Sequence, residues 1–532
     1  MYSSYTTLQR AQLAKQEYLD TQRVFLGVYA PGRSAALKAS LQDQLHRKFL
    51  LTDSLRPEAL GSAAGVLLVR EDLSLMPTAL SCFADALRSG ADYVTSDAVF
   101  GYSGVTTLYH SQGFAACPGC ALVSRELLLR CRAEARDPEN PVELLTLAAK
   151  LSRSHVCLPL ALAHYERDIC AEDVWSVKGK RVFIMSHLLD MTGAPIVLVS
   201  AVPVLRSMGY EVVVLGPEDG GSMPLFLEAG ATVITRKGCV QSPLLWGLAL
   251  CADLVLANTV VEARAVRALS GARVPVLWWL HDAFAGYPHI AHQIPRELSE
   301  NIRLYSVGSH AANAMHSVRP EFNIRPLIYG LPDYAAEKFS HYDLSYAGGR
   351  PLFATVGSFE NRKGQDIFCK AIRLLPPETM KKASFLFVGK AAEAEMMDAV
   401  RSLTADCPDN VFYVKRLTRD EIKSLMAQCT CLVCASRDDP MPTFVTEGLI
   451  FGKPAIVSEH TGTAGLITEG VDGFVYEDDD PEKLAERLAW AIEHPEKLAA
   501  MRTACRELYE SHYSKQAFSG SLQRAVKELT GE

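Results

Sequence analysis

Apolar runs that do not alternate with polar residues, each followed by a turn and a segment of helical period, recur along this chain. The stretch 180–221, KRVFIMSHLLDMTGAPIVLVSAVPVLRSMGYEVVVLGPEDGG, contains a buried strand, a glycine-containing turn, a long helix and a second strand. Strands that are apolar on both faces are typical of parallel sheets, which helices cover on both sides. The pattern therefore predicts an α/β fold built from βαβ units.

Three blocks of this kind are predicted along the 532 residues, which are too many for one ordinary core. The first block covers 1–175 and ends in the turn-rich YERDICAEDVWSVKGK. The second covers 176–340, and the third, 341–532, restarts after the glycine-rich SYAGGRP and ends in a long helical tail. The second and third blocks, joined near 335–350, are predicted to be doubly wound domains that leave a cleft at the carboxyl ends of their strands, where ligands bind.

Composition and charge narrow the possible partners. The chain is 48% hydrophobic and 22% charged, and its net charge of −7 argues against a nucleic-acid partner, because phosphate binding needs a basic face. No apolar export signal is visible at the N-terminus. The longest apolar run, 242–261, contains Asp253 and Asn258 and is interpreted as a buried helix and strand rather than a membrane span. We therefore expect a cytoplasmic protein, with a peripheral membrane contact left open.

The fourteen cysteines are expected to be reduced and mostly buried, since the chain is long and shows no export signal. Cys117 and Cys120 form a single CPGC, which lacks the two further ligands of a zinc site and the strand-to-helix context of a redox motif. CTCLVC at 429–434 alternates like a buried strand. The cysteines therefore predict no metal site.

Charged residues after a strand of the third block predict an anion site. In GSFENRKGQD, 357–366, Gly357 and Ser358 lie at the strand end, and Arg362 and Lys363 follow in the loop before a helix. Two cations beside a helix N-terminus form a good site for an anion. A solvated loop with a turn glycine is the alternative.

Two carboxylates stand eight positions apart in SRDDPMPTFVTEG, 436–448. Asp439 follows a predicted strand, and the two prolines after it prevent an early helix. The helix is therefore expected to begin at Thr443, with Glu447 about one turn inside it.

This spacing suggests a site for a nucleotide diphosphate-sugar. The amides of Thr443 and Phe444 would form a helix N-terminus able to hold a phosphate. Glu447 would accept hydrogen bonds from the two hydroxyls of a ribose, and Asp439 would face the sugar beyond the diphosphate. The alternative is that Asp439 caps the helix and Glu447 complements its dipole.

The third block resembles the C-terminal domain of the GT-B glycosyltransferases of family four, the large retaining family. The motifs GSFENRKGQD, FLFVGK, the acid-x7-acid pair, FGKPAIVS and TEGVDGFVYEDDDPEKLAERL occur in the same order within 350–515. The resemblance implies that Lys363, helped by Arg362, binds the diphosphate, that Glu447 binds the ribose, and that Asp439 binds the donor sugar.

The resemblance also places the base of the nucleotide near Arg416 and Leu417. Two positions depart from the family pattern. The first acid, usually Glu, is Asp439, and the strand-end Gly-Arg is Gly357-Ser358, so one phosphate-binding cation is missing unless Arg362 replaces it.

The second block resembles the N-terminal domain of the same family. In SHLLDMTGAP, Gly193 matches the family's glycine-rich loop against the diphosphate-sugar. In WWLHD, His281 lies at a strand end, where the family often has a histidine near the transferred sugar; a purely structural histidine is the alternative. IYGLPD, 328–333, resembles the connector between the two domains.

The first block resembles the start of a shortened family-two, GT-A glycosyltransferase, including a strand that ends in Thr52-Asp53. The metal-binding Asp-x-Asp of that family reads Arg70-Glu71-Asp72 here, and a cation in the first position would repel Mg²⁺. We therefore expect a non-catalytic domain that holds an acceptor or a partner. A residual second transferase activity is the alternative.

Together these resemblances imply a retaining glycosyltransferase that uses no metal or other cofactor. It would transfer a sugar from a nucleotide-diphosphate-sugar donor to a glycan, lipid-linked or protein acceptor, in surface polysaccharide or glycoconjugate synthesis. Two alternatives remain open: a GT-B nucleotide-sugar epimerase, which would need no acceptor, and a catalytically weak subunit that binds nucleotide sugars for another transferase.

Overall fold

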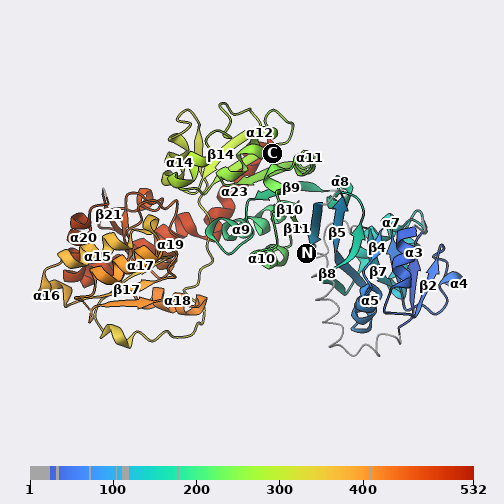
Figure 1. Ribbon diagram of the computed structural model, residues 1–532, viewed down its shortest axis with the longest axis horizontal. Helices are drawn as coiled ribbons and strands as arrows, with labels where there is room; N and C mark the ends of the chain where they lie inside the picture. The colour runs from blue at the N-terminus through green and yellow to red at the C-terminus, as the bar shows by residue number, and fades with distance from the viewer. Residues whose placement is uncertain are drawn as a thin grey trace. The chain divides into compact units, whose positions relative to one another are not determined.

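Helices and parallel strands alternate through most of the chain, which confirms the predicted α/β fold (Figure 1). The computed structural model describes residues 24–31, 35–70, 73–102, 105–110, 119–175, 179–407, 409–477 and 479–532. The chain forms two compact units. The first unit extends to Leu256 and includes 272–274, and the second comprises 257–271 and 275–532.

The first unit is built on a mixed sheet. Its strands lie in the order β2-β1-β3-β7-β5-β6-β11-β10-β9-β12, with β8 beside β5 and β4 beside β8, and the boundary between the units falls inside β12. The strands are β1 (Leu26–Tyr29), β2 (Phe49–Thr52), β3 (Gly65–Val69), β4 (Ser74–Leu75), β5 (Tyr93–Tyr102), β6 (Val105–His110), β7 (Cys120–Ser124), β8 (His155–Tyr165), β9 (Lys180–Ser186), β10 (Tyr210–Gly216), β11 (Thr232–Thr235) and β12 (Leu254–Asn258). The helices are α3 (Ala35–Gln42), α4 (Pro57–Leu60), α5 (Ala79–Arg88), α6 (Arg125–Glu134), α7 (Pro141–Leu151), α8 (Ala171–Val174), α9 (Gly193–Ser207), α10 (Met223–Glu228), η1 (Cys239–Gln241) and α11 (Pro243–Ala249).

The stretch 180–221 forms the βαβ unit that its sequence predicts. β9 and β10 are parallel, with Lys180 opposite Tyr210, and α9 connects them. Most residues of both strands are buried, as expected for strands that helices cover on both faces.

The sheet also joins this βαβ unit to the N-terminal part of the chain. β6 runs antiparallel to β11, with His110 opposite Val233. His110 lies between two carboxylates, with Nδ1 2.8 Å from Asp97 Oδ2 and Nε2 3.1 Å from Asp219 Oδ1. Burial lowers the pKa of His110, but the hydrogen bonds and charges of Asp219 and Asp97 raise it to about 10. A charged network therefore reinforces the contact between β6 and the strands after it.

The second unit contains two groups of parallel strands. β13 (Val276–Leu280), β14 (Ile302–Ser306) and β15 (Ile324–Pro326) are parallel neighbours. A six-stranded parallel sheet has the order β18-β17-β16-β19-β20-β21. Its strands are β16 (Leu352–Val356), β17 (Ser384–Val388), β18 (Val411–Val414), β19 (Cys431–Cys434), β20 (Ala455–Ser458) and β21 (Gly473–Tyr476).

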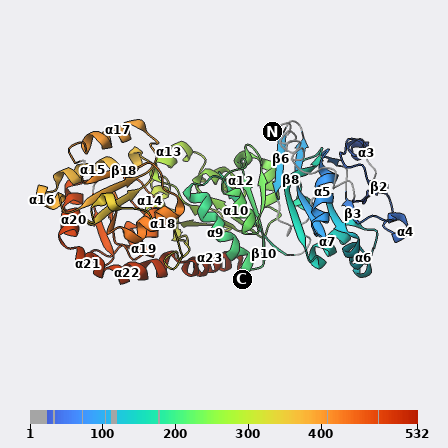
Figure 2. The same ribbon diagram turned by 90° about the horizontal axis from the view of Figure 1, so that it is seen from below.

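Helices flank this second sheet on both faces (Figure 2). α15 contacts α17 and α20, whereas α18 contacts α19. The helices of the second unit are η2 (Val260–Glu262), α12 (Ala263–Ala268), η3 (Phe284–Gly286), α13 (Tyr287–Ile290), α14 (Ser309–His316), η4 (Ser345–Ala347), η5 (Asn361–Lys363), α15 (Gln365–Leu374), α16 (Pro377–Met380), α17 (Ala394–Leu403), α18 (Arg419–Gln428), α19 (Thr443–Ile450), η6 (Ala464–Leu466), α20 (Pro481–Glu493), α21 (Pro495–Ala500), α22 (Arg502–Leu508), η7 (Tyr509–Tyr513) and α23 (Lys515–Thr530). The sheet is thus doubly wound.

The strand order of this sheet reverses between β16 and β19. β17 and β18 lie on one side of β16, while β19, β20 and β21 lie on the other. In doubly wound sheets the loops that leave two such strands diverge and open a crevice at the carboxyl ends, where ligands bind. The candidate site is therefore expected in the loops that follow β16 and β19.

The helical tail returns to the β13 part of the second unit. Phe518 of α23 stacks on Trp279 of β13, with ring centroids 5.7 Å apart. The backbone N–H of Leu331 donates to Tyr513 O at 2.8 Å, and Tyr509 Oη donates to Leu331 O at 2.9 Å. The tail therefore anchors the strands that precede the six-stranded sheet.

Two smaller predictions concern single segments. The four residues of CLVC form β19 and are all buried, as the alternation of CTCLVC predicts. In the part of the chain that the structure describes, no helix is both long and apolar enough to cross a membrane.

Candidate functional site

The loops after β16 and β19 meet, as the reversal of strand order requires. The backbone N–H of Arg437 donates to Arg362 O at 2.9 Å. Gly364, with a φ of +62°, ends the first loop so close to the second that a Cβ there would lie 1.9 Å from Ala435 O. Glycine is therefore needed at this position both for its backbone conformation and for the close approach.

Lys363 and Asp439, which the sequence assigns to these two loops, form a direct ion pair. Lys363 Nζ lies 2.5 Å from Asp439 Oδ2, and the two side chains are 19% and 5% exposed. Asp439 Oδ1 accepts a hydrogen bond from the N–H of Met441 at 3.2 Å. The pair therefore forms a largely desolvated polar centre in the crevice.

The strand-end residues of the first loop are held by a second carboxylate. Ser358 Oγ and Arg362 Nη2 both donate to Glu360 Oε1 at 2.9 Å, and Arg362 Nη1 donates to Asp438 O at 3.1 Å. The N–H of Gly357 donates to Val388 O at 2.9 Å. Arg362 thus lies beside the crevice with its guanidinium engaged by the chain's own oxygens, and its role toward a diphosphate stays a prediction.

α19 begins at Thr443, the residue at which the prolines predict its start. Pro442 occupies the N-cap position, and no side chain accepts a hydrogen bond there. Among the described residues, the backbone N–H groups of Thr443 and Phe444 have no acceptor, whereas that of Val445 donates to Pro442 O. Asp439 therefore does not cap α19, and two amides remain open to an anion.

Glu447 lies in the second turn of α19 and is only 6% exposed. Its Oε1 accepts a hydrogen bond from Arg419 Nη1 at 2.7 Å. Burial raises the pKa of Glu447, although the charge and hydrogen bond of Arg419 oppose the shift. The predicted ribose acceptor is thus a buried carboxylate with one cationic partner.

The residues predicted to bind the base lie just before Arg419 in the sequence. Arg416 is exposed and Leu417 is half-buried, both in the loop between β18 and α18. Thr418 caps α18, since its hydroxyl accepts from the N–H of Glu421 while Glu421 accepts from the N–H of Thr418. Arg419 was not among the predicted site residues, although the Thr-x-x-Glu capping box indicates that it is the first residue of a helix.

Asp438 is a second residue that the sequence analysis missed. Its Oδ1 lies 2.7 Å from His310 Nε2 and accepts from the N–H of Phe284 at 3.1 Å, and its Oδ2 accepts from the N–H of Ala285 at 3.1 Å. Burial by itself raises the pKa of Asp438, but these hydrogen bonds hold it below its usual value. Asp438 thus connects the loop 435–442, which we call the acid loop, to the segment that follows β13.

His281 belongs to that same segment, directly after β13. Its ring lies 4.5 Å from the ring of Trp279. The next residue, Asp282, accepts a hydrogen bond from the N–H of Val260 at 2.6 Å, and burial raises the pKa of Asp282 to about 6. The role of His281 toward a sugar stays a prediction.

Gly193 lies in the first unit, as the first residue of α9. A Cβ at this position would meet no heavy atom within 4 Å. The helix N-terminus is therefore sterically open at Gly193, and its part in the site stays a prediction.

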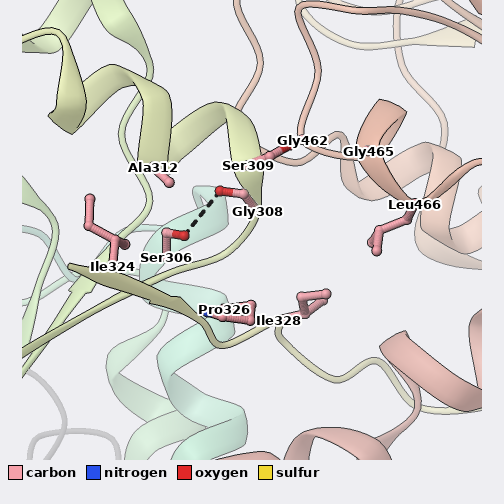
Figure 3. A pocket seen from close by; sticks show the side chains of 10 residues that line it. All are labelled: Ser306, Gly308, Ser309, Ala312, Ile324, Pro326, Ile328, Gly462, Gly465 and Leu466. Carbon is pink, nitrogen blue, oxygen red and sulfur yellow. Dashed lines mark hydrogen bonds between the residues drawn. The ribbon is translucent and has the colours of Figure 1, made fainter. Parts of the chain in front are cut away.

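A cavity of about 290 Å³ adjoins the acid loop within the second unit (Figure 3). Ser306 Oγ donates to Gly308 O at 3.0 Å in its wall, and the N–H of Gly462 donates to Asp439 O at 2.9 Å. Its lining is mostly small or apolar: Ser306, Gly308, Ser309, Ala312, Ile324, Pro326, Ile328, Gly462, Gly465 and Leu466. The space beside the acid loop therefore accepts nonpolar surface more readily than charge.

Other predicted features lie away from this crevice or outside the described residues. Glu71, Asp72 and Cys117 lie outside the described residues. Cys120 is buried in β7, and burial raises the pKa of its thiol to about 12. Within the described parts of the chain, no group of three or more His, Cys, Asp or Glu residues is placed to hold a metal ion.

Two family models match the chain. The model of glycosyl-transferase family 4 matches residues 178–314, and the model of glycosyl transferases group 1 matches residues 338–508. The second range contains Lys363, Asp439 and Glu447.

Curated relatives match shorter parts. An uncharacterised glycosyltransferase of Methanocaldococcus jannaschii is 26% identical over 144 residues, which are 26% of this chain and 38% of that protein. The glycogen synthase of Pseudomonas syringae pv. tomato is 27% identical over 179 residues, which are 33% of this chain and 35% of that enzyme. The chain thus spans little more than a third of the length of these relatives.

Solved structures show the fold of the larger part of the chain. The Anabaena protein HepE, in complex with UDP and glucose, superposes with a TM-score of 0.53 at 17% identity, over 66% of this chain and 100% of HepE. Sucrose-phosphate synthase from Thermosynechococcus elongatus superposes with a TM-score of 0.52 at 15% identity, over 66% of this chain and 99% of the synthase. These structures show a GT-B-like fold for about two thirds of the chain. The family models show that residues 178–314 are similar to glycosyl-transferase family 4 and residues 338–508 to glycosyl transferases group 1.

Proposed function

We propose that this chain transfers a sugar from a nucleotide-diphosphate-sugar donor to an acceptor hydroxyl, with retention at the anomeric carbon. One observation carries the proposal. The Lys363–Asp439 pair and the open amides at the start of α19 belong to the two loops that meet where the strand order reverses. The structure of HepE in complex with UDP and glucose supports the same class of donor.

The charges of the crevice fit the leaving group. When the bond between the anomeric carbon and the diphosphate oxygen breaks, negative charge develops on the diphosphate. Lys363 and the amides of Thr443 and Phe444 would oppose that charge, helped by Arg362 and by the positive end of the α19 dipole. The proposal assigns this task to the chain's own groups, without a metal or another cofactor.

Carboxylates would orient the rest of the donor. Glu447 accepts from the ribose hydroxyls, Asp439 from the hydroxyls of the sugar, and Arg416 and Leu417 contact the base. The acceptor oxygen attacks the anomeric carbon from the face that the diphosphate leaves, and its proton passes to the departing phosphate oxygen. His281 completes the proposed site beside the sugar.

We propose that residues up to 175 form a shortened, non-catalytic GT-A-like domain that holds an acceptor or a partner. The position of Glu139 supports this proposal, because its contacts lie at the strand ends where a catalytic domain of this kind would have its ligand pocket. Tyr29 Oη donates to Glu139 O at 2.7 Å, and the N–H of Leu55 donates to Glu139 Oε2 at 2.8 Å. Tyr29 is the last residue of β1 and Leu55 follows β2, so both contacts lie at the carboxyl edge that parallel sheets use for ligands.

The acceptor that we propose is a glycan, lipid-linked or protein acceptor of surface polysaccharide or glycoconjugate synthesis in the cytoplasm. The mostly nonpolar cavity beside the acid loop supports an acceptor that presents an apolar surface as well as a hydroxyl.

A calorimetric and thermal-shift screen against UDP-, GDP- and dTDP-sugars, with and without EDTA, tests the proposal. A donor at 100 times its Kd stabilises the protein by about 2.7 kcal/mol. We expect one donor to bind in EDTA, to lose binding in Glu447→Ala, and to keep it in Glu378→Ala, whose carboxylate is exposed. Binding that requires metal and ignores Glu447 would contradict the assigned site. Turnover without an acceptor would indicate an epimerase, and binding without turnover a partner subunit.

A further inference from the structure

Arg419 is hydrogen-bonded to Glu447, the carboxylate that we propose binds the ribose. Its Nη1 lies 2.7 Å from Glu447 Oε1, and the side chains are 61% and 8% exposed. Arg419 is the first residue of α18, directly after Thr418, which forms a capping box with Glu421. An exposed cation therefore covers a buried anion in the proposed donor crevice.

An aromatic ring supports the guanidinium from the other side. Arg419 Cζ lies 5.7 Å from the centroid of the Tyr334 ring, and Arg419 Nη2 donates to Tyr334 Oη at 3.4 Å. Lys423 Nζ lies 4.9 Å from the same ring and 2.6 Å from Glu337 Oε2. Stacking against an aromatic face keeps an arginine ordered without removing it from water.

Few other charges act on Glu447. The charge of Lys423 in α18 lowers the pKa of Glu447, as that of Arg419 does. The charge of Glu447 in turn raises the pKa of Tyr329 and Tyr334, in the segment before β16. Among the residues that the structure describes, Arg419 is the charged group in direct contact with the carboxylate.

The remaining elements packed against α19 direct their polar groups elsewhere. Arg506 of α22 donates to Ile450 O at the far end of α19, Tyr513 of η7 donates to Met441 Sδ, and Cys434 of β19 lies beside Ser436 Oγ. Burial is the largest influence on the pKa of Glu447, and Arg419 is the main charged group that opposes it.

We propose that Arg419 is a positioning residue of the ribose subsite, which keeps Glu447 ionised and oriented as a hydrogen-bond acceptor and shares it with the donor's ribose. The inference rests on the proposed function. A carboxylate accepts two hydroxyl donors, whereas a protonated carboxyl presents a donor of its own to one of them. The five N–H groups of the guanidinium allow it to turn outward and still hold Oε1 when the ribose arrives.

A pH dependence follows, with its sign set by the burial of Glu447. Burial raises the pKa of this carboxyl, and the charge and hydrogen bond of Arg419 lower it. Removal of Arg419 should therefore raise the pKa further. Donor affinity is present above this pKa and is lost as the pH falls through it. We therefore expect Arg419→Gln to lose donor affinity at a higher pH than the unaltered protein does.

The first measurement needs no donor. The titration of the Glu447 carboxyl is followed by ¹³C NMR of glutamate-labelled full-length protein, and Glu447→Gln identifies the signal. We expect Arg419→Gln to raise the midpoint by about one pH unit or more, and Arg419→Lys to restore part of the shift. Arg487→Gln is the matched control, because Arg487 pairs with Glu469 at 2.8 Å on the exposed surface. An unchanged midpoint in Arg419→Gln would overturn the inference.

The second measurement is the calorimetric Kd of the donor between pH 5.5 and 9. We expect about a tenfold weaker Kd for Arg419→Gln at the acid end and a ratio near one at the alkaline end. A weakening that is constant across the pH range would mean a direct contact with the donor and would overturn the positioning role. If the midpoint shifts but the unaltered protein binds no nucleotide sugar, the proposed function fails and the ribose subsite with it.

Discussion

Lys363 and Asp439 cannot be removed independently, because each neutralises the other in a poorly hydrated crevice. Their contact of 2.5 Å leaves Asp439 without a cationic partner once Lys363 is shortened. A buried charge without its counterion is strongly destabilising, whereas replacement of both members of a pair is often nearly neutral. Loss of stability and loss of catalysis are therefore separable at this pair.

We predict that Lys363→Ala lowers turnover by about 10²–10³, because one preorganised charge contact with the leaving diphosphate is lost. Thermal unfolding should show a lower Tm for this variant. In Lys363→Ala/Asp439→Asn the Tm should recover, because no unpaired carboxylate remains, while turnover stays low. Recovery of both, measured with the donor identified by calorimetry, would mean that Lys363 acts only on stability.

The sequence predicts site residues where local spacing decides their position. The prolines after Asp439 determine where α19 begins, and the spacing of the two acids places Glu447 in its second turn. Arg419 and Asp438 were missed because their partners lie far away in the sequence. Asp438 contacts residues 128 and 154 positions earlier, and no local period carries such contacts.

At the scale of elements, Asp438 joins the loop after β19 to the segment after β13. One carboxylate accepts three hydrogen bonds there, two from backbone N–H groups and one from His310. The carboxylate of Asp438 therefore connects the segment that holds His281 to the loop that holds Asp439. Accurate placement of such groups matters, since small displacements of reacting groups are costly to the rate.

We predict that Asp438→Asn lowers turnover and destabilises the protein by about 2 kcal/mol at pH 7, because charge-assisted hydrogen bonds are replaced by weaker ones. The folded pKa of Asp438 lies below its unfolded value near 3.8. Its contribution is therefore full above that value and is lost as the pH falls through the folded pKa.

Melting curves of both proteins at pH 7 and at pH 3 test this prediction. The difference in Tm should be large at pH 7 and should shrink at pH 3. Asp406→Asn is the control, because Asp406 is 77% exposed in its pair with Arg373. A difference that is the same at both pH values would assign the effect to shape rather than to charge.

Strands and helices were predictable where parallel strands are apolar on both faces, as in β9, β10 and the six-stranded sheet. The antiparallel pairing of β6 with β11 could not be predicted from the sequence. Its register joins residues more than a hundred positions apart, and the alternation of β6 alone does not indicate which strand it meets.

At the scale of the whole chain, the N-terminal part and the βαβ unit after it share one sheet within the first unit. The ionic network of Asp97, His110 and Asp219 lies at this contact. His110 is 3% exposed and carries its charge because two carboxylates face it. The stability of the first unit should therefore depend on this histidine in a defined pH range.

We predict that His110→Gln destabilises the first unit, with the largest effect at low pH. The folded pKa of about 10 lies above the unfolded value of 6.5, so the contribution is full below 6.5 and is lost as the pH rises through 10. Guanidinium unfolding at pH 6, 8 and 10, compared with the exposed control His512→Gln, should show a difference that narrows as the pH rises. A difference that grows toward pH 10 would contradict a charged His110.

During translation, β6 is synthesised well before β11, the strand with which it pairs. His110 leaves the ribosome 123 residues before its partner Val233, from the difference 233 − 110. At about 5–20 residues per second, β6 waits roughly 6–25 s with an unpaired edge. During that interval a nascent chain displays a strand that another nascent chain can pair with. Translation that stalls between these two positions would therefore favour aggregation more than a stall after β11.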